Sequence, residues 1–327
     1  MRRTREGRIV KIVNILAALS AVISSAVMAQ SYPVKPIRLV MSVSGGAEVV
    51  VRVASQRWLE TTGQPMVMEV QSGAGGAVGA EMVAKAAPDG YTLLLATASA
   101  ITMRPHLAKN TPYDPIRDFT PIIRNGEAVL VVAANPNAPF NSVREMVQYA
   151  KNNPGKLSYG SSGVGTNHHI SAELIRRAAD IDMVHVPYKT APQLMNDTIG
   201  GQIPVGFTIL ATISSNVKAG KLKLLGVYNT RRYHLIPDVA TVAEQVPGYE
   251  PPPGWMGYLG PANMPPALVT RLNTDLAKFY SEPGLLARAD ASGILIANST
   301  PAEFADGIKR EFETVGRAIK AAGIQAE

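Results

Sequence analysis

The stretch from residue 157 to residue 173, LSYGSSGVGTNHHISAE, brings hydroxyls, imidazoles and glycines together. A short β-prone run precedes its glycines, and apolar residues at helical spacing follow them. Glycines have no side chain to cover their backbone N–H groups. The N-terminus of the helix behind them carries about half a positive charge. Such a junction can hold an anion without arginine or lysine. The pattern predicts a strand, an anion-binding loop suited to a carboxylate, and a helix capped by Thr166 or Asn167.

The same stretch also contains the side chains of a serine hydrolase. Ser161 or Ser162 would be the nucleophile and His168 or His169 the base in a secreted enzyme of that class. The G-x-S-x-G motif that exposes such a nucleophile needs a second glycine, and this chain has Val164 at that position. The acids are scattered, without the close pair typical of acid–base catalysis. We therefore expect no catalytic residues and keep the hydrolase as the alternative function.

A metal site and a plain turn are two further interpretations. His169 and Glu173 are four residues apart, so they share a helix face and could bind one metal ion. No further ligand accompanies this pair, whereas protein metal sites need three or four, so we expect no metal. Clusters of glycine and serine also form flexible surface turns, and the sequence leaves that alternative open.

A glycine run at residues 73–79 invites a dinucleotide-binding interpretation. Val78 stands where the third glycine of G-x-G-x-x-G is required. Asp89 precedes the following strand, whereas the ribose-binding acid should end it. We therefore expect no NAD, no FAD and no other cofactor.

A second junction of strand, glycine and helix lies near the start of the chain. The strand expected over residues 37–43 runs into small residues that precede a helix, and ligands of open α/β sheets bind at such strand ends. Thr97 and Ser99 follow another expected strand and would add hydroxyls at the same edge. Two such loops, one in each domain, could face each other and hold one anion. The small residues of this second loop are Ser44, Gly45, Gly46 and Ala47.

Strand-forming and helix-forming runs alternate from residue 36 to residue 228. This alternation predicts an α/β fold with a mainly parallel sheet. A mature chain of about 300 residues exceeds what one core usually holds, so two domains are expected.

Breaks rich in proline and glycine, at residues 135–139 and 247–254, bracket a central block. A block inserted in this way is joined by two chain crossings, the layout of a hinged, two-lobed ligand trap. We expect hinges near Asn135 and Gly248. The expected lobes are residues 30–132 with 250–327, and residues 133–249.

The chain begins with a basic segment, an apolar run and a small-residue site, which predicts a signal peptide over residues 1–29. These residues carry five of the basic side chains and one acid, so their removal reduces the net charge from +7 to +3. No cluster of basic and aromatic residues remains that would predict nucleic-acid binding. The chain has no cysteine, which excludes disulfides and thiolate chemistry. We expect a soluble periplasmic protein.

Several short motifs occur in an order typical of one known family. They are YPVKPIR at 32–38, GAGG at 73–76, APDGYTL at 87–93, PYDP at 112–115, HVPYK at 185–189, AGKL at 219–222 and IPDVATV at 236–242. With the stretch at 157–173 they span the chain after the expected signal. The sequence resembles the solute receptors of tripartite tricarboxylate transporters, the Bug family of periplasmic binding proteins.

This resemblance implies an α/β, two-lobed periplasmic-binding-protein fold of the Venus flytrap kind, type II-like, with two hinge crossings. It implies a monomer that captures a small organic carboxylate, either a di- or tricarboxylate or an aromatic one, in the cleft between the lobes. The partners would be the membrane subunits of a tripartite tricarboxylate transporter. A loaded receptor that docks on a signalling protein is a further alternative.

The resemblance also assigns ligand-binding residues. Thr208 stands where the family often has Asp, and Ser42-Val43-Ser44 replaces a proline-rich run, so the far end of the ligand is expected to differ. The residues carried over as ligand-binding are Ser44, Gly45, Gly46, Ala47, Thr97, Ser99, Ser161, Ser162, Gly163, Gly165, Thr166 and Thr208.

Overall fold

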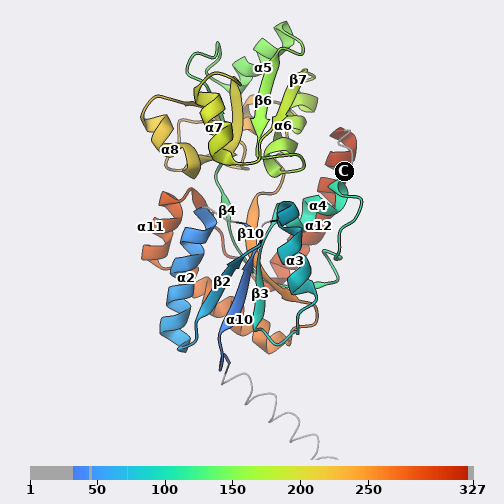
Figure 1. The fold of residues 1–327 in the computed structure, drawn as a ribbon, viewed down its shortest axis with the longest axis vertical. Coiled ribbons are helices and arrows are strands. Elements are labelled where there is room, and N and C mark those ends of the chain that lie inside the picture. Colours follow the sequence, from blue (N-terminus) through green and yellow to red (C-terminus); the bar gives the residue numbers. More distant parts are fainter. Residues whose placement is uncertain (1–31, 44–45, 72, 323–327) are drawn as a thin grey trace, which may run out of the picture.

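The computed structural model describes residues 32–43, 46–71 and 73–322. These residues form two α/β lobes stacked along the long axis of the molecule, each around its own sheet (Figure 1). Within them, no helix is long and apolar enough to span a membrane. The expected signal peptide and two residues of the first predicted loop, Ser44 and Gly45, lie outside the described residues.

The first lobe is built on a six-stranded sheet in the order β11-β4-β10-β3-β1-β2. Its strands are β1 (Ile37–Met41), β2 (Met66–Val70), β3 (Thr92–Thr97), β4 (Phe119–Ala128), β10 (Trp255–Pro261) and β11 (Ile294–Ile296). Its helices are α2 (Gly46–Thr62), α3 (Ala77–Ala84), α4 (Arg104–Leu107), α10 (Pro266–Tyr280), α11 (Pro283–Ala291) and α12 (Pro301–Ala322), with short turns η1 (Gly73–Gly76) and η2 (Ser99–Met103).

The second lobe is built on a five-stranded sheet in the order β7-β6-β8-β5-β9. Its strands are β5 (Leu130–Ala134), β6 (Leu157–Ser161), β7 (Met183–Pro187), β8 (Val205–Ile209) and β9 (Lys223–Val227). Its helices are α5 (Val143–Asn152), α6 (Asn167–Ala178), α7 (Ala191–Ile199), α8 (Leu210–Lys218) and α9 (Val242–Gln245).

Successive residues of the central strands point into different cores. Leu93 and Leu95 in β3 pack in one apolar cluster, whereas Leu94 and Ala96 pack in another on the opposite face. All four side chains are fully buried. A sheet covered by helices on both faces buries both sets of side chains, which is why β3 has a continuous apolar sequence.

Both sheets are mixed, whereas the alternation of strands and helices predicted mainly parallel ones. β1, β2 and β3 are parallel, but β10 runs antiparallel to both β3 and β4. In the second lobe β5 is antiparallel to β8 and β9. The antiparallel strands β10 and β5 are the two that the chain enters directly from the other lobe, and local pattern does not reveal their direction.

The chain crosses between the lobes at Val129 and again over residues 250–254. β4 ends at Ala128 and β5 begins at Leu130, so the expected boundary between residues 132 and 133 falls inside β5. Asn229 fixes this crossing, because it donates to Ala128 O at 2.8 Å and accepts from Leu130 N at 2.8 Å. Just before the second crossing, Tyr249 still packs in the core of the second lobe.

The hinge expected near Asn135 is wrong. Asn135 is buried, and its side chain donates to Thr198 O at 2.9 Å and Ile199 O at 3.0 Å, deep in the second lobe. Its side-chain oxygen also accepts from Asn137 N at 2.8 Å. The Asn-Pro-Asn sequence thus makes a local turn between β5 and α5, and turn-forming residues within a lobe look the same in sequence as a linker.

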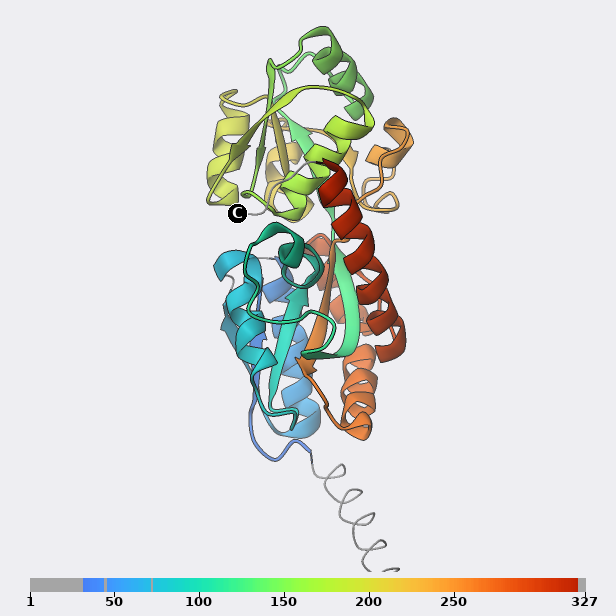
Figure 2. The same cartoon turned by 90° about the vertical axis from the view of Figure 1, so that its right-hand side faces the viewer.

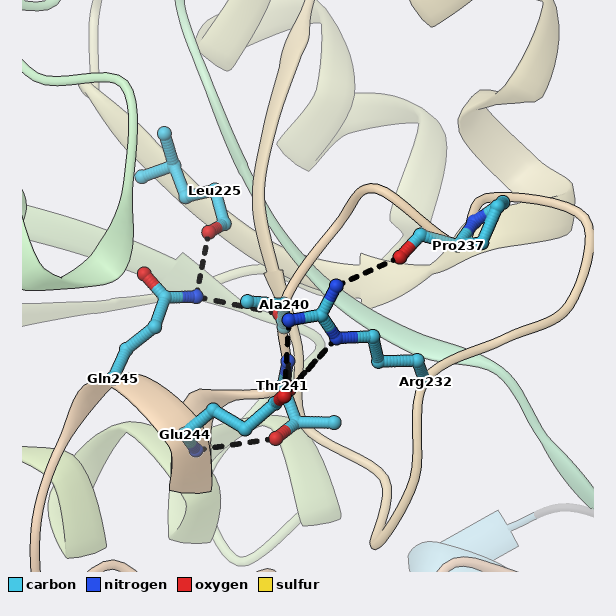
Figure 3. Close-up of polar contacts among 7 residues, drawn as sticks. All are labelled: Leu225, Arg232, Pro237, Ala240, Thr241, Glu244 and Gln245. Atoms are coloured by element: carbon cyan, nitrogen blue, oxygen red, sulfur yellow. Dashed lines mark hydrogen bonds and ion pairs between the residues drawn. The ribbon is translucent and has the colours of Figure 1, made fainter.

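The IPDVATV motif forms a structural junction in the second lobe (Figure 3). Thr241 and Glu244 form a reciprocal capping box at the start of α9, and Arg232 binds the same glutamate with N–O distances of 3.0–3.1 Å. Gln245 donates to Leu225 O in β9 at 3.0 Å and accepts from Val143 N in α5 at 2.8 Å. These bonds tie the loop after β9 to its sheet, so the motif stabilises the lobe rather than forming part of the predicted loops.

Candidate ligand-binding site between the lobes

The loop from Ser162 to Thr166 joins the end of β6 to the start of α6, as the sequence predicted. Thr166 is the N-cap, and its hydroxyl accepts from His169 N at 3.4 Å and donates to Gly163 O at 2.8 Å. Gly163 and Gly165 have φ angles of 118° and 74°. These backbone angles are costly for residues with a Cβ, which explains the glycines. The loop is therefore an ordered turn with a defined shape.

The hydroxyl of Ser161 supports the loop from below. Ser161 is fully buried, and its Oγ accepts from Gly163 N at 3.2 Å and lies 3.1 Å from Gly163 O. The same Oγ lies 2.7 Å from Nε2 of His185 in the neighbouring strand β7. The Gly163 amide is thus engaged by the protein itself, whereas the sequence alone suggested that the glycine amides were all free.

A stack of rings continues this support beneath α6. His185 stacks on His169 with ring centroids 4.1 Å apart, and on Tyr159 at 5.0 Å. Nδ1 of His169 accepts from Gly165 N at 3.1 Å, so this nitrogen carries no proton. The Tyr159 hydroxyl donates to Glu173 at 2.8 Å. Burial lowers the pKa of His185 to about 4, with a smaller contribution from His169, so the imidazole of His185 is neutral at pH 7.

Ser162 pairs with Nδ1 of His168, one of the combinations that a hydrolase would need. The other ring nitrogen of His168 is buried and has no hydrogen-bond partner in the described part of the chain. A catalytic histidine needs an acid at that nitrogen to orient it. Burial also lowers the pKa of His168 to about 4, which disfavours the imidazolium that a general base must become. The geometry therefore contains a serine–histidine pair but not a triad.

Glu173, the carboxylate of the possible metal-binding pair, is already engaged by other side chains. Glu173 accepts from Tyr159 and pairs with Arg176 at 2.8 Å, so both of its oxygens are engaged. His169 uses Nδ1 for the Gly165 amide. Among residues 32–43, 46–71 and 73–322, no group of three or more histidines and acids is placed to hold a metal ion.

The remaining predicted residues lie at strand ends in both lobes. Gly46 and Ala47 begin α2, and Ala47 is buried, while Thr97 ends β3 and Ser99 begins η2 with partial exposure. In the second lobe β6 and β8 are parallel neighbours that pair at Gly160 and Gly206, and Ser162 directly follows the end of β6 while Thr208 lies near the end of β8. Thr208 is buried and its hydroxyl lies 3.1 Å from that of Thr212.

The two lobes meet at the loop after β6. A Cβ built on Gly165 would lie 3.2 Å from Leu107 in α4 of the first lobe. Asn167 donates to Pro253 O of the second crossing at 2.7 Å, and Ile170 packs in a core cluster of the first lobe. In Figure 2, α4 lies at the end of the first lobe that faces the second lobe. The loop therefore lies at the boundary between the lobes.

Four surface cavities are formed by other residues. The first, of about 300 Å³, lies between α6, the second crossing and α12, and includes Ile170 and Val315. Two others share Arg124, Trp255 and Glu311 beside the hinge, and the fourth lies between α2 and α11. None of these four is lined by the twelve residues predicted to bind ligand, so the site rests on the loops and strand ends described above.

Sequence reasoning missed the supporting residues Tyr159, His185 and Glu173 as a group. The sequence showed His185 only as part of the HVPYK motif, without a partner. His185 is 24 residues from Ser161 in sequence and reaches it only because β6 and β7 pair side by side. The HVPYK motif was the available signal, because its histidine lies in a strand-forming run.

Two α/β lobes joined by two crossings, with helix N-termini near their boundary, form the fold of periplasmic solute-binding proteins. The sequence profile of the family described as "Tripartite tricarboxylate transporter family receptor" matches residues 50–324. The chain belongs to this family.

Relatives of known sequence and structure agree with this assignment. A UPF0065 protein of Bordetella pertussis is 30% identical over 324 residues, which are 98% of each chain. The structure of R. palustris Rpa4515 with adipate is 28% identical, with a TM-score of 0.81 over 90% of this chain and all of the other. The periplasmic binding protein BugD is 26% identical, with a TM-score of 0.78 over 90% of this chain and all of BugD.

Proposed function

We propose that this protein captures a small organic carboxylate between its lobes in the periplasm and delivers it to a tripartite tricarboxylate-type membrane transporter. The observation that carries the proposal is the ordered glycine loop at the start of α6, placed where the second lobe meets the first. The family supports the transport role, and the adipate in the structure of Rpa4515 supports a dicarboxylate.

The amides at the start of α6 are the natural donors for the ligand. Gly163 N and Gly165 N are engaged by Ser161 and His169. The hydrogen bonds of the described residues include no acceptor for the N–H groups of Asn167 and His168 at the first turn of α6. A carboxylate there would meet unsatisfied donors and the positive end of the helix dipole.

A direct ion pair is the competing way to hold the ligand. Arg104 lies in α4, one helical turn before the Leu107 that approaches Gly165. Its Nε is buried and has no hydrogen-bond partner among the described residues. Arg104 is therefore the cation whose substitution tests whether charge, in addition to amides, holds the carboxylate.

The test is thermal unfolding and calorimetry with malonate, succinate, glutarate, adipate, citrate, benzoate and acetate. A bound ligand should stabilise the protein by about 2.7 kcal/mol at a hundredfold excess over its Kd. Native mass spectrometry of protein purified from a bacterial periplasm should reveal a retained acid. Absence of stabilisation by every acid, together with an empty purified protein, would contradict the proposal.

Arg104→Gln separates the two modes of binding. If amides hold the carboxylate, this variant should keep most of its affinity and Gly163→Val should lose it. Loss of binding in Arg104→Gln, with Gly163→Val unaffected, would show instead that an ion pair holds the ligand. Arg117→Gln is the control, because Arg117 is exposed and already paired with Asp118 at 3.1 Å.

The hydrolase alternative has its own readout. Ester turnover that disappears in Ser162→Ala would support an enzyme built on Ser162 and His168. We expect no such turnover, because the second nitrogen of His168 is buried without an acid partner among the described residues. Ser161 is fully buried and cannot reach an ester carbonyl without opening of the loop.

Ligand binding should also close the lobes about Val129 and residues 250–254. X-ray scattering with and without saturating ligand should show a smaller radius of gyration for the bound protein. An unchanged profile with calorimetrically confirmed binding would mean that the crossings do not act as a hinge.

A further inference from the structure

We propose that His169 and His185 are positioning residues for ligand binding: two stacked imidazoles that fix the loop after β6 in its binding shape. The inference rests on the proposed function, because the loop is taken to be the carboxylate site. Neither histidine is required to touch the ligand. Their contacts include Gly165, Ser161 and each other.

Each of the two left-handed glycines is held by one side-chain acceptor. Gly165 N donates to Nδ1 of His169 at 3.1 Å, and Gly163 N donates to Oγ of Ser161 at 3.2 Å. Both bonds leave the ligand-facing amides of α6 untouched, because they use two amides that precede the helix. Without these acceptors the glycines would sample several backbone conformations, because glycine has few steric restrictions.

His185 connects the two bonds. Its Nε2 lies 2.7 Å from Ser161 Oγ, and its ring stacks on His169 with an interplanar angle of 12°. Ser161 has a single hydroxyl proton, while Gly163 O and His185 Nε2 both lie within hydrogen-bond distance of its oxygen. A neutral imidazole can donate or accept at Nε2 according to its tautomer, so it satisfies this hydroxyl in either arrangement.

The base of the stack is fixed by residues of β6 and α6, the two elements that flank the loop. Tyr159 in β6 lies under His185 and is bonded to Glu173 in α6, which in turn pairs with Arg176. His169 is 8% exposed and Glu173 is 9% exposed, so the network lies largely out of water. Buried networks of hydrogen bonds restrict their members to few geometries.

Two matched substitutions isolate the nitrogen that matters at position 169. Both His169→Asn and His169→Leu remove the ring and its stacking on His185. Only Asn retains an acceptor, its Oδ1, at the place of Nδ1. The probe is the acid, among those tested above, that stabilises the wild type most. We expect its binding to weaken by about tenfold in His169→Leu and by no more than about threefold in His169→Asn.

The same logic applies at position 185. Gln places a polar atom near the position of Nε2, whereas Met has similar length and none. We expect His185→Met to weaken binding by about tenfold and His185→Gln to restore most of the affinity. Thermal unfolding without ligand should show a loss of stability in both members of each pair, because both lose the same ring.

Hydrogen exchange of the peptide that covers residues 160–166 provides a second measurement on the unliganded protein. Exchange should be faster in His169→Leu than in His169→Asn if the imidazole holds the loop. If the Leu variant does not fold, His169→Gln replaces it, since its amide lies one carbon too far to bond Gly165.

The outcomes are distinct. If wild type binds none of the acids, the proposed function fails and this inference fails with it. If wild type binds an acid but Leu and Asn at position 169 have equal affinity and equal loop exchange, the proposed function stands and the positioning role is wrong. The role is supported only if the variants that retain a polar atom bind better than their apolar counterparts at both positions.

Discussion

The two lobes present different kinds of strand end at their boundary. In the second lobe, Ser161, Thr166 and His169 hold the loop after β6 through five hydrogen bonds. In the first lobe, the hydroxyl of Thr97 has no hydrogen-bond partner among the described residues, and that of Ser99 has only a 3.9 Å contact with the sulfur of Met103. The loop after β6 is therefore held by the protein's own hydrogen bonds, whereas the described strand ends of the first lobe have hydroxyls still available.

This difference suggests a division of labour. An organised loop loses little conformational entropy on binding. It can therefore anchor any carboxylate with a similar contribution to the free energy of binding. Free hydroxyls contribute only when a ligand offers them a partner, so they distinguish one acid from another. Disturbing one lobe while the other serves as reference tests this contrast.

Acid should produce the largest difference between the lobes. The pKa of His168 and of His185 is lowered to about 4, mainly by burial. Above the unfolded-state pKa of 6.5 both imidazoles are neutral, and their contribution to the stability of the folded protein is complete. This contribution is lost as the pH falls toward 4, and it is on the order of 2 kcal/mol for the pair after solvent screening.

The first lobe should respond in the opposite direction. Burial raises the pKa of Glu127 in β4 and of Glu311 in α12 above the usual carboxyl value. Such groups favour the folded state below the unfolded pKa and oppose it as the pH rises. Hydrogen exchange at pH 7 and pH 4.5 should show loss of protection in β6 and α6 but not in β4. Equal loss in both lobes would contradict the contrast.

Gly163→Val should give the next largest effect, on ligand affinity. The substitution forces a branched residue into a left-handed backbone, which costs about 1–3 kcal/mol and reshapes the loop. Gly220→Val is the matched control, because Gly220 has a φ of 68° and open space around it, in the turn after α8. Calorimetry should show affinity reduced in the first variant only, although both lose stability. Equal affinities would show that the loop does not contact the ligand.

Thr166→Ala should have a smaller effect on both stability and binding. Removing an N-cap threonine costs about 1 kcal/mol. Thr190→Ala is the control, because Thr190 caps α7 with the same 3.4 Å contact to the third helical amide. Urea unfolding should show similar losses for the two variants. Only Thr166→Ala should also weaken ligand binding, because the Thr166 hydroxyl donates to Gly163 O in the loop.

Thr97→Val should change selectivity more than affinity. The hydroxyl contributes roughly 1 kcal/mol to an acid that reaches it and nothing to one that does not. Dissociation constants for the series from malonate to adipate should therefore shift unequally. A uniform shift across the series would mean that the first lobe anchors the ligand in the same way as the second.

Sequence was sufficient for the features that depend on neighbouring residues. The strand, the loop and a cap at Thr166 or Asn167 were predicted for residues 157–173, and the structure has the strand, the loop and the cap at Thr166, because turn and cap chemistry is local. The hinge at Asn135 was misplaced, since a turn and a linker use the same residues. The role of Ser161 was also hidden, because His185 reaches it only through the pairing of β6 with β7.

Arg52→Ala should have the smallest effect. Arg52 is the cation closest in sequence to the first loop, but its side chain is 68% exposed and pairs with Glu48 four residues earlier in α2. Exposed pairs of this kind contribute about 0–1 kcal/mol, and the pairing leaves the guanidinium committed to its own helix. Affinity for any carboxylate should therefore stay within about twofold of wild type at constant salt. If Arg52→Ala abolished binding while Gly163→Val bound normally, the anchor would lie in the first lobe and depend on charge, which reverses the contrast drawn here.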